Sequence, residues 1–555
     1  MTSSSKELEC DYLVVGAGAA PMAFIDTLLT ELPDSKVILI DKKAAPGGHW
    51  VDAYGFVRLH QPSIVYGISS QQLEGNWLKL LLTKLTLPWK HRASKKEMLT
   101  YFGNFVDKKV ASKQLDFYPN SIYKFETKGK VDQDGIHYFS SVDGSMSYKV
   151  KVNSKLVDGT RGECIIPHGK KKYRNLFDHS MEFDPSHFSV PSSTSDSPLQ
   201  FPVDEGVRVM TPNQIYDTHQ EKGDKRSVML KNKYVVLGAG KTGMDAIVYL
   251  QRKMKIDPVN IAWVIPNDVW MFNGSAGGRP WDFPESMAKC SNDIDKASFS
   301  LEKEGKLVRL DENITPTRFR FPVTQLNELK LLRKVKTIIR RGRATAIRRK
   351  NNSHVTVEFE SNHPPWDGFA PIETCIFVHA TSPGPSNDRF DSMGGEDIFG
   401  SSRNMTLHLI FLPPVSFSMS CLAKIEAARV KGTLDTGVMR RLALAFGEEK
   451  TAGSDFTDDD LLKILIKRVS PSGNDIHRGT INQVLLLAFI DRDPMVPLKW
   501  MKQNRLSFLS IPGVKADSCN HVRMLRSKGT TLGLPENHVR MLDVLGEKIV
   551  PLEGM

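Results

Sequence analysis

The chain has 555 residues, of which 40% are hydrophobic and 25% charged. This composition is typical of a globular protein, and the length predicts two to four domains. Six cysteines lie far apart with no C-x-x-C, which argues against a disulfide framework, a zinc or other metal site, and a redox-active cysteine pair. The longest late apolar run, residues 484–490, is too short to span a bilayer, and residues 1–10 hold no signal core. We therefore expect a cytoplasmic protein with no membrane span.

The net charge of +12 raises the possibility of an anionic partner. Basic residues concentrate in residues 330–350, where apolar and basic side chains alternate as they do in a half-exposed strand. Few aromatic residues interleave with these charges. The pattern favours a solvated strand face, and we expect no nucleic-acid partner.

Residues 11–50 have the pattern of a nucleotide-binding βαβ unit. An apolar run at residues 12–15 leads into the turn G-A-G-A-A-P at residues 16–21, and apolar positions then recur at helical spacing. A second apolar run, residues 37–40, ends at Asp41. The order strand, glycine turn, helix, strand and acid is the one that binds the ADP half of a dinucleotide. A glycine-rich turn in some other α/β protein is the structural alternative.

Each position of this first turn has an expected role. Gly16 allows the tight turn, Gly18 lets the backbone approach a pyrophosphate, and Ala19 begins the helix that faces the phosphates. Asp41, followed by Lys42, is placed to accept the ribose hydroxyls. The third glycine of the usual pattern is replaced by Pro21, which a first helical turn tolerates.

Residues 46–50, directly after the acidic strand end, read P-G-G-H-W. A Gly-Gly pair with a nearby Trp at this place resembles the flavin-containing monooxygenases, and this resemblance implies that the nucleotide is a flavin, with Gly48, His49 and Trp50 as candidate flavin contacts. A Pro-Gly turn with a core Trp is the structural alternative. In the following residues 55–63, Phe56, Arg58 and His60 would share one face of a strand. Residues 77–105 are expected to be mostly helical, with Ser94 and Glu97 forming a capping box. His49, Arg58 and His60 are the candidate catalytic residues.

A second βαβ unit contains the complete G-x-G-x-x-G motif. Residues 234–237 are a predicted strand, the turn places Gly238, Gly240 and Gly243, and residues 261–265 form the next strand. Lys241 and Thr242 are further candidate cofactor contacts within this turn. The strand is followed by P-N-D rather than by an acid at its tip, which favours NADP, and no Arg stands at the expected point. The choice between NADH and NADPH stays open.

Two such units in one chain resemble the flavin-containing monooxygenase superfamily, whose members bind FAD and NAD(P)H in successive βαβ domains. The resemblance covers about residues 10–430. It includes the Thr-containing turn at residues 155–160 and the strand at residues 375–384, which contains Thr381 and resembles the strand that returns such chains to the FAD domain. The fingerprint F-x-G-x-x-x-H-x-x-x-[YFW] of established members is not found.

The resemblance implies an α/β fold with two Rossmann-like domains, the NAD(P) domain inserted into the FAD domain, and a mainly helical C-terminal extension. The expected boundaries are 1–170 (FAD, first part), 171–225 (connection), 226–370 (NAD(P)), 371–430 (FAD, return part) and 431–555 (extension). Residues 138–155 are expected to form a meander or hairpin, residues 435–446 and 458–468 helices, and residues 481–490 a buried segment.

The resemblance further implies an FAD-dependent, NAD(P)H-using oxidoreductase. A monooxygenase that uses molecular oxygen and a small organic substrate is the first hypothesis. Two alternatives stay open: an NAD(P)H-dependent flavin reductase or dehydrogenase with another acceptor, and a non-catalytic nucleotide-binding protein.

Overall fold

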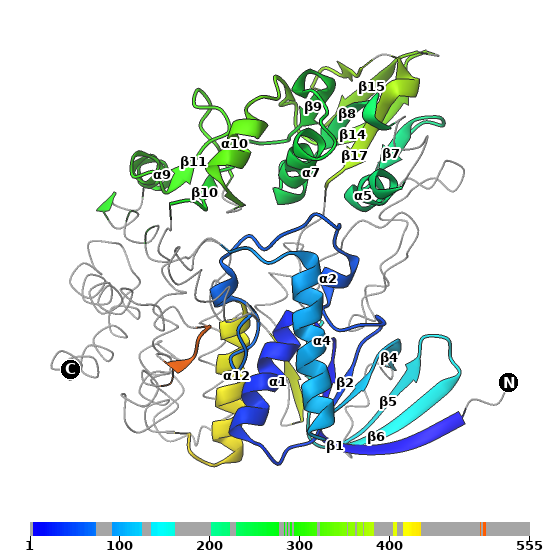
Figure 1. The fold of residues 1–555 in the computed structure, drawn as a ribbon, viewed down its shortest axis with the longest axis vertical. Helices are drawn as coiled ribbons and strands as arrows, with labels where there is room; N and C mark the ends of the chain where they lie inside the picture. The colour runs from blue at the N-terminus through cyan, green and yellow to red at the C-terminus, as the bar shows by residue number, and fades with distance from the viewer. Residues whose placement is uncertain are drawn as a thin grey trace, which may run out of the picture.

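The computed structural model describes residues 4–73, 91–124, 135–160, 201–221, 229–276, 282, 286, 289–290, 293–318, 322–351, 353–360, 363–369, 371–381, 403–407, 415–434, 500 and 503–506. Figure 1 shows the arrangement of these parts, with the first sheet below and the second above. The predicted helices at 435–446 and 458–468 and the predicted buried run at 481–490 lie outside the described residues. Within the described residues, no helix is long and apolar enough to cross a bilayer.

The first sheet joins a parallel part to an antiparallel meander, in the order β3-β2-β1-β6-β5-β4, and β18 also pairs with β6. β1 pairs in parallel with β2 and β6, whereas β4, β5 and β6 run antiparallel. β5 and β6 confirm the predicted meander. The strands are β1 (Ser4–Val15), β2 (Val37–Ile40), β3 (Leu115–Tyr118), β4 (Ser121–Lys124), β5 (Ile136–Ser141), β6 (Met146–Asp158) and β18 (Asn404–Thr406).

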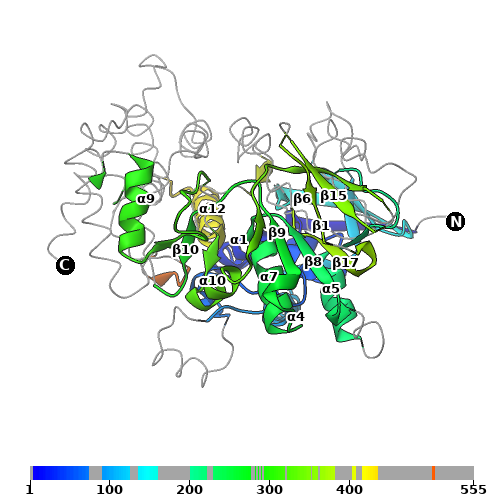
Figure 2. The same ribbon diagram turned by 90° about the horizontal axis from the view of Figure 1, so that it is seen from above.

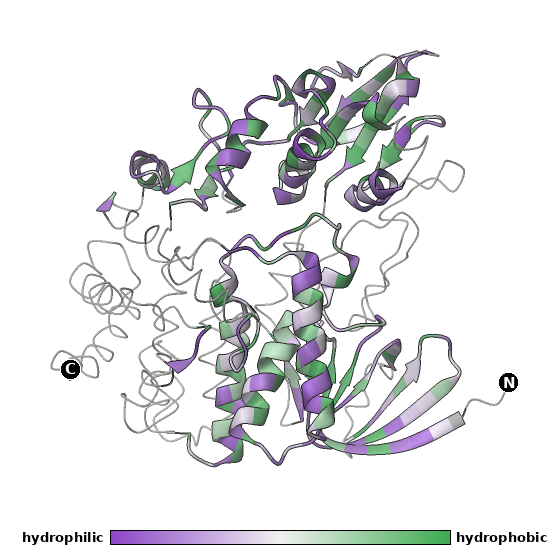
Figure 3. Ribbon diagram, viewed as in Figure 1, coloured by the Kyte–Doolittle hydropathy of each residue, from purple (hydrophilic) through white to green (hydrophobic). Residues whose placement is uncertain are grey.

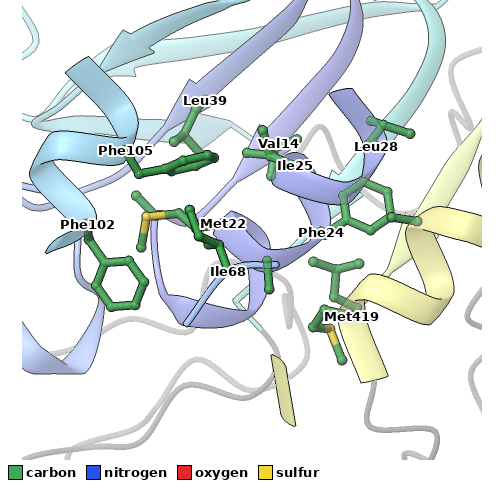
Figure 4. Close-up of a cluster of buried hydrophobic side chains, with 14 of the residues drawn as sticks. Val14, Met22, Phe24, Ile25, Leu28, Leu39, Ile68, Phe102, Phe105 and Met419 are labelled. Atoms are coloured by element: carbon green, nitrogen blue, oxygen red, sulfur yellow. The ribbon is translucent and has the colours of Figure 1, made fainter. Parts of the chain in front are cut away.

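Three helices belong to this first unit: α1 (Ala19–Glu31), α4 (Lys95–Ala111) and α12 (Val415–Val430). α12 lies alongside α1 (Figure 1 and Figure 2), and Lys424 on α12 binds Glu31 at the end of α1 with an Nζ–Oε1 distance of 2.7 Å. The apolar residues that the helical spacing of α1 brings together fill one core with residues from β1, β2, α4 and α12 (Figure 4). The labelled side chains are each at most 1% exposed: Val14, Met22, Phe24, Ile25, Leu28, Leu39, Ile68, Phe102, Phe105 and Met419.

The start of α4 follows the predicted capping box. The Ser94 hydroxyl accepts a hydrogen bond from the Glu97 backbone N–H, and the Glu97 carboxylate accepts one from the Ser94 backbone. α4 begins at Lys95, as the predicted N-cap Ser94 requires, and continues to Ala111, so the predicted end at residue 105 was wrong. Residues 77–90 lie outside the described residues. Two short helical turns precede α4 in the chain: α2 (His49–Asp52) and η1 (Ser63–Val65).

The second sheet is parallel throughout, in the order β13-β9-β8-β17-β7. Helices cover one face, and an antiparallel sheet of β14, β15 and β16 shares an apolar core with the other face. Figure 3 shows hydrophobic residues gathered along these strands, while the helices carry both hydrophobic and hydrophilic residues. The strands are β7 (Arg208–Met210), β8 (Lys233–Leu237), β9 (Ile261–Val264), β13 (Thr337–Ile339), β14 (Ala344–Arg349), β15 (Val355–Phe359), β16 (Trp366–Asp367) and β17 (Cys375–His379).

The helices of the second unit are α5 (Pro212–Gln220), α7 (Lys241–Arg252) and α10 (Leu326–Leu332), with the short turns η3 (Pro258–Asn260) and η4 (Ile372–Thr374). A small three-stranded sheet stands beside them. It is formed by β10 (Met271–Asn273), β11 (Leu307–Val308) and β12 (Val323–Thr324), and α9 (Ile294–Lys303) accompanies it. The mixed α/β class with parallel sheets agrees with the prediction from the sequence.

Two segments lie in a different sheet or element from the one expected. The strand at residues 375–379, expected to return the chain to the first sheet, pairs instead with β7 and β8 in the second sheet. Its residues are all buried, as a central parallel strand requires. The first sheet receives β18 instead. Residues 208–220, expected to be a connection, supply the edge strand β7 and the helix α5.

The basic stretch forms strands, as predicted. β14 buries Ala346 and Ile347 while its arginines reach the surface, where Arg348 pairs with Asp204 at 3.2 Å. Arg340, directly after β13, binds Asp268 through two nitrogens at 2.7 and 3.2 Å. The positive charges described here are therefore largely balanced by neighbouring acids.

A short segment near the C-terminus is anchored in the first unit. The Arg505 guanidinium donates hydrogen bonds of 2.6–2.8 Å to the carbonyl oxygens of Ile64, Tyr66, Ile68 and Gln71. The next residue, Leu506, is fully buried in the core under α1. One side chain thus gives a charged donor to four carbonyls of residues 64–71, and the Gln71 carbonyl also accepts from the Tyr101 hydroxyl at 2.6 Å.

We expect Arg505→Met to lower the free energy of unfolding by roughly 3 kcal/mol, because it leaves four carbonyl groups without their charged donor. Chemical denaturation measures the change. Arg343→Met is the matched control, since Arg343 is exposed, and it should change stability by less than about 0.5 kcal/mol. Equal effects of the two substitutions would contradict the anchoring role.

Candidate functional site

The first glycine loop leaves β1 through a left-handed residue. Gly16 has φ +97°, and its N–H donates to the Ile40 carbonyl at 2.8 Å. A Cβ at this position would lie 3.2 Å from the Thr160 methyl group and 3.5 Å from the Gly159 backbone. The predicted tight turn is therefore present, and its glycine is required both by conformation and by space.

Asp41 lies under this loop and binds its backbone. One carboxylate oxygen accepts from the Ala17 N–H at 2.5 Å, and the other accepts from the Lys43 N–H at 2.7 Å. Burial raises the pKa of Asp41, although these two N–H groups oppose the shift. Asp41 thus fixes the shape of the loop. Its predicted contact with ribose hydroxyls stays a prediction, as does a cofactor contact for the partly buried Lys42 beside it.

Pro21, at the position of the missing third glycine, packs against a glycine elsewhere. Gly159 follows β6, and a Cβ there would lie 2.1 Å from Pro21 Cγ. The proline is in the first turn of α1, where its missing N–H costs no helical hydrogen bond. The close packing expected of a third glycine is therefore kept, with Gly159 giving the space that Pro21 fills.

The turn at residues 47–50, called here the GGHW turn, packs against the first glycine loop. The Gly47 N–H donates to the Ala17 carbonyl at 2.8 Å, and Gly48, with φ +56°, approaches so closely that a Cβ would lie 2.7 Å from Gly18 Cα. Lys43 closes the turn by donating to the Gly48 carbonyl at 2.8 Å and pairing with Asp52 at 2.5 Å. The buried Trp50 donates its indole N–H to the Tyr66 hydroxyl at 3.1 Å.

The second glycine loop has a separate use for each glycine. Gly238 has φ +120°, and a Cβ there would lie 2.7 Å from the Ala380 carbonyl oxygen. Gly243 lies so close to the Gly238 carbonyl that a Cβ would approach its oxygen to 2.3 Å. Around Gly240, in contrast, a Cβ would meet no atom within 4 Å. Two glycines thus serve protein packing, whereas the third leaves open space at the start of α7.

The two loops have equivalent hydrogen-bond connections. Gly16 donates to the last residue of β2 and Gly238 to the last residue of β9. Gly159 donates to the end of β1 at 2.9 Å, and Ala380 donates to the end of β8 at 3.1 Å. Gly159 and Ala380 are each followed by a threonine. The Thr160 hydroxyl binds Asp158, and the Thr381 hydroxyl binds His379, both at 2.8 Å. Thr381 therefore lies at the second loop, not at the first.

Lys241 lies in an ion cluster at the start of α7. Its Nζ pairs with Asp245 at 2.7 Å and with Glu328 on α10 at 3.2 Å. Burial acts to lower the pKa of Lys241, but the two carboxylates outweigh it and the pKa is raised. Lys241 is thus a cation balanced by two acids. The neighbouring Thr242 hydrogen-bonds to Tyr54, a residue of the first unit.

The three predicted catalytic residues lie on one segment of the first unit. Val57 and Leu59 are buried while Arg58 and His60 are exposed, as predicted, but only Arg58 forms a strand-like bridge, to Ser94. Arg58 donates to the Arg92 carbonyl at 3.0 Å.

His49 and His60 lie within electrostatic range of each other. Burial, with smaller effects of Lys43 and His60, lowers the pKa of His49 to about 4, so this imidazole is neutral at pH 7. The pKa of His60 is also lowered, chiefly by loss of hydration, while Asp245 of the second unit opposes the shift. Charges of the second unit therefore act on His60, whereas Arg58 is bound to the Arg92 carbonyl.

Several residues of this region were not found from the sequence. Arg340 lies at the carboxyl end of β13, beside the end of β9, and its partner Asp268 is buried. Tyr54 donates its hydroxyl to Asp245 across the two units at 2.9 Å. The aromatic-glycine-aromatic sequence at residues 54–56 was the available signal for Tyr54, whereas nothing local distinguished Arg340 from the other arginines.

Comparison with known sequences finds no matching family model. Uncharacterised proteins of Mycobacterium tuberculosis and Mycobacterium bovis are 30% identical over 354 residues. This match covers 62% of the chain and 56% of each relative, so the chain aligns with little more than half the length of these proteins.

Solved structures with a similar arrangement include three enzymes. An ornithine N-hydroxylase of Kutzneria sp. 744, in a complex with reduced FAD, NADP⁺ and L-ornithine, matches over 68% of the chain and 83% of its own, with 10% identity and a TM-score of 0.40. Cyclohexanone monooxygenase matches over 76% and 88%, with 11% identity and a TM-score of 0.42. A flavin-containing monooxygenase from Stenotrophomonas maltophilia matches over 77% and 99%, with 11% identity and a TM-score of 0.39.

We expect Gly159→Ala to lower the free energy of unfolding by about 1–3 kcal/mol, because the new methyl group overlaps the Pro21 ring. Adding Pro21→Gly should restore part of this loss, so that the double variant is less destabilised than the sum of the single variants. Gly103→Ala on α4 is the matched control, as no atom lies within 4 Å of its Cβ position. Denaturant unfolding of the four variants tests this, and simple additivity would rule out direct contact as the cause.

Proposed function

We propose that the chain is an FAD-dependent, NAD(P)H-using oxidoreductase of the monooxygenase type that acts on a small organic molecule. The observation that carries this proposal is the contrast among helix starts. α4, α5 and α9 begin with side chains that accept hydrogen bonds from their first-turn N–H groups, whereas α1 and α7 begin at glycines with no side-chain cap. The four-residue α2 also begins at a glycine, Gly48, without a side-chain cap, but among the described helices of at least eight residues for which an N-cap is seen, the uncapped starts of α1 and α7 are the ones that follow the equivalent glycine loops. An anionic pyrophosphate at each would supply the missing acceptors.

The residues of the first loop fit FAD. Gly18 gives the phosphates access to the start of α1, and Ala19 contributes the first helical N–H. The GGHW turn places Gly48 against Gly18. A flavin whose pyrophosphate is bound at Gly18 would therefore be contacted by Gly48, His49 and Trp50. Asp41 would contribute chiefly by holding Ala17 in place.

The residues of the second loop fit a nicotinamide dinucleotide. The open space at Gly240 accommodates a pyrophosphate against the start of α7, and Gly238, Gly243 and Thr381 shape the turn. Since Lys241 is engaged by Asp245 and Glu328, we assign it to this cluster and not to phosphate binding. Arg340, at the end of β13 beside β9, is engaged by the buried Asp268 in the same way, so it is not counted as a reader of a 2′-phosphate.

The chain order supports an inserted arrangement. All strands of the second sheet lie between β6 and β18, both of which belong to the first sheet. We therefore assign residues 4–160 and 403–434 to the FAD domain and residues 201–381 to the NAD(P) domain, in place of the boundaries at 226 and 370.

When bound, the nicotinamide supplies a hydride and the flavin passes the electrons on to an acceptor. The protein's part is to bind both cofactors at the helix starts and to hold the two loops in register. His49, neutral at pH 7, can accept a proton at an imidazole nitrogen. Burial raises the pKa of Cys10 and Cys375 to about 12, which disfavours thiolate chemistry at these two cysteines.

We expect the purified protein, when it is supplied with FAD, to bind one flavin per chain, as measured by its absorbance. Gly18→Val should reduce FAD affinity by at least about 100-fold, since its side chain would occupy the phosphate side of the loop. Titration of apoprotein with FAD measures both. Gly103→Ala serves again as the control with unchanged affinity, and a flavin-free wild-type protein in saturating FAD would refute the assignment.

The second prediction concerns reduction and reoxidation of the flavin. Without oxygen, NADPH should bleach the flavin of the wild-type protein, whereas Gly240→Val should bind FAD normally but lose this reduction. Stopped-flow mixing of reduced enzyme with oxygen then distinguishes the two enzyme hypotheses. An absorbance species distinct from oxidised and reduced flavin supports a monooxygenase. Direct return to oxidised flavin, with all electrons recovered as peroxide across a substrate panel, supports a reductase.

A further inference from the structure

The two units are joined by a buried tyrosine that neither cofactor motif contains. Tyr54 follows α2 in the first unit, is 7% exposed, and donates its hydroxyl to Asp245 Oδ2 on α7 at 2.9 Å. Burial and the neighbouring carboxylate raise the pKa of Tyr54 well above its usual value, so the hydroxyl keeps its proton. It is a permanent donor toward the second unit.

Asp245 is part of the helix start that the second loop creates. Its other oxygen binds Lys241, the first residue of α7, and Lys241 also binds Glu328 on α10. A hydrogen bond from Tyr54 therefore acts on a cluster that spans two helices of the second unit. The position of Tyr54 sets where the start of α7 lies relative to the first unit.

Aromatic packing around Tyr54 makes the connection stiff. Phe56 stacks on Tyr249 of α7, with ring centroids 4.1 Å apart and planes at 15°. Gly55 is covered by the Tyr216 ring of α5, so closely that a Cβ would lie 2.2 Å from it. Residues 54–56 are thus held by two helices of the second unit.

The same segment continues without a break into the GGHW turn. Asp52, two residues before Tyr54, pairs with Lys43, which also binds the Gly48 carbonyl, and Gly48 lies against Gly18. A short rigid path therefore runs from the first glycine loop through α2 and Tyr54 to the second.

We propose that Tyr54 is a positioning residue that holds the two cofactor loops at the separation and orientation needed for hydride transfer. This inference rests on the proposed function. Hydride transfer requires close and directed approach of the two rings, and a displacement of about 1 Å can lower a rate about 100-fold. Tyr54 acts through Asp245 and α7 and needs no contact with either cofactor.

The test compares Tyr54→Phe, which keeps the ring but loses the hydroxyl, with Tyr66→Phe, which loses the hydroxyl that accepts from Trp50 in the first unit. Hydrogen–deuterium exchange of residues 241–252 should rise in Tyr54→Phe and stay at the wild-type level in Tyr66→Phe. In saturating NADPH without oxygen, Tyr54→Phe should reduce its flavin at least about 10-fold more slowly than the wild type, with FAD content and NADPH affinity within about threefold.

Asp245→Ala provides the second variant, removing the same bond from the other side. The double variant Tyr54→Phe/Asp245→Ala should show the same amide exchange of residues 241–252 and the same rate of flavin reduction as Asp245→Ala alone. Unchanged exchange of α7 in Tyr54→Phe, or a double variant with additive effects, would overturn the proposal. A wild-type protein that binds no flavin would refute the proposed function instead, while the exchange measurements would still decide whether Tyr54 fixes α7.

Discussion

The fold depends on how the loops after β1 and β8 meet the ends of β6 and β17, the strands that lie beside them. At this point the chain must turn sharply enough to start a helix while leaving room for the end of the neighbouring strand. Gly16 and Gly238 meet both demands with left-handed backbones, and side chains there would collide with Thr160 or Ala380. The helix axis, the exposed helix start and the register of the next strand all follow from this one turn.

The two units satisfy the same packing constraint with different residues. In the second unit Gly243 brings α7 close to the turn, as the usual motif requires. In the first unit Pro21 occupies that position, and the space is recovered at Gly159 of the returning strand, whose equivalent in the second unit is Ala380. Close packing therefore requires that the first turn of the helix and the residue after the neighbouring strand fit each other, and it does not require a glycine at the third position of the motif. A sequence motif within one segment contains only one of the two residues that pack together.

This division explains what could be predicted from the sequence. The strands of the two βαβ units, the glycine turns, the capping box of α4 and the meander depend on residues within a few positions of each other, and these were predicted correctly, whereas the strand face expected at residues 56–60 is only an isolated bridge at Arg58. The strand at residues 375–379 was placed in the wrong sheet, because its buried apolar sequence suits any central parallel strand. The roles of Tyr54, Arg340 and Arg505 depend on partners far away in the chain, so no local pattern could reveal them.

The ion cluster at the second loop shows why a basic residue in a glycine motif need not bind phosphate. Moving the Lys241 ammonium out of water is costly unless opposite charges lie close to it. Asp245 and Glu328 supply these charges. A dinucleotide phosphate recruiting Lys241 would have to leave one or both carboxylates unpaired in a partly buried position. The uncapped N–H groups of α7 carry no such cost, because they have no competing side chain. The electrostatics therefore support the proposal that a phosphate binds at the helix start, while Lys241 and Asp245 join α7, α10 and Tyr54 at one junction.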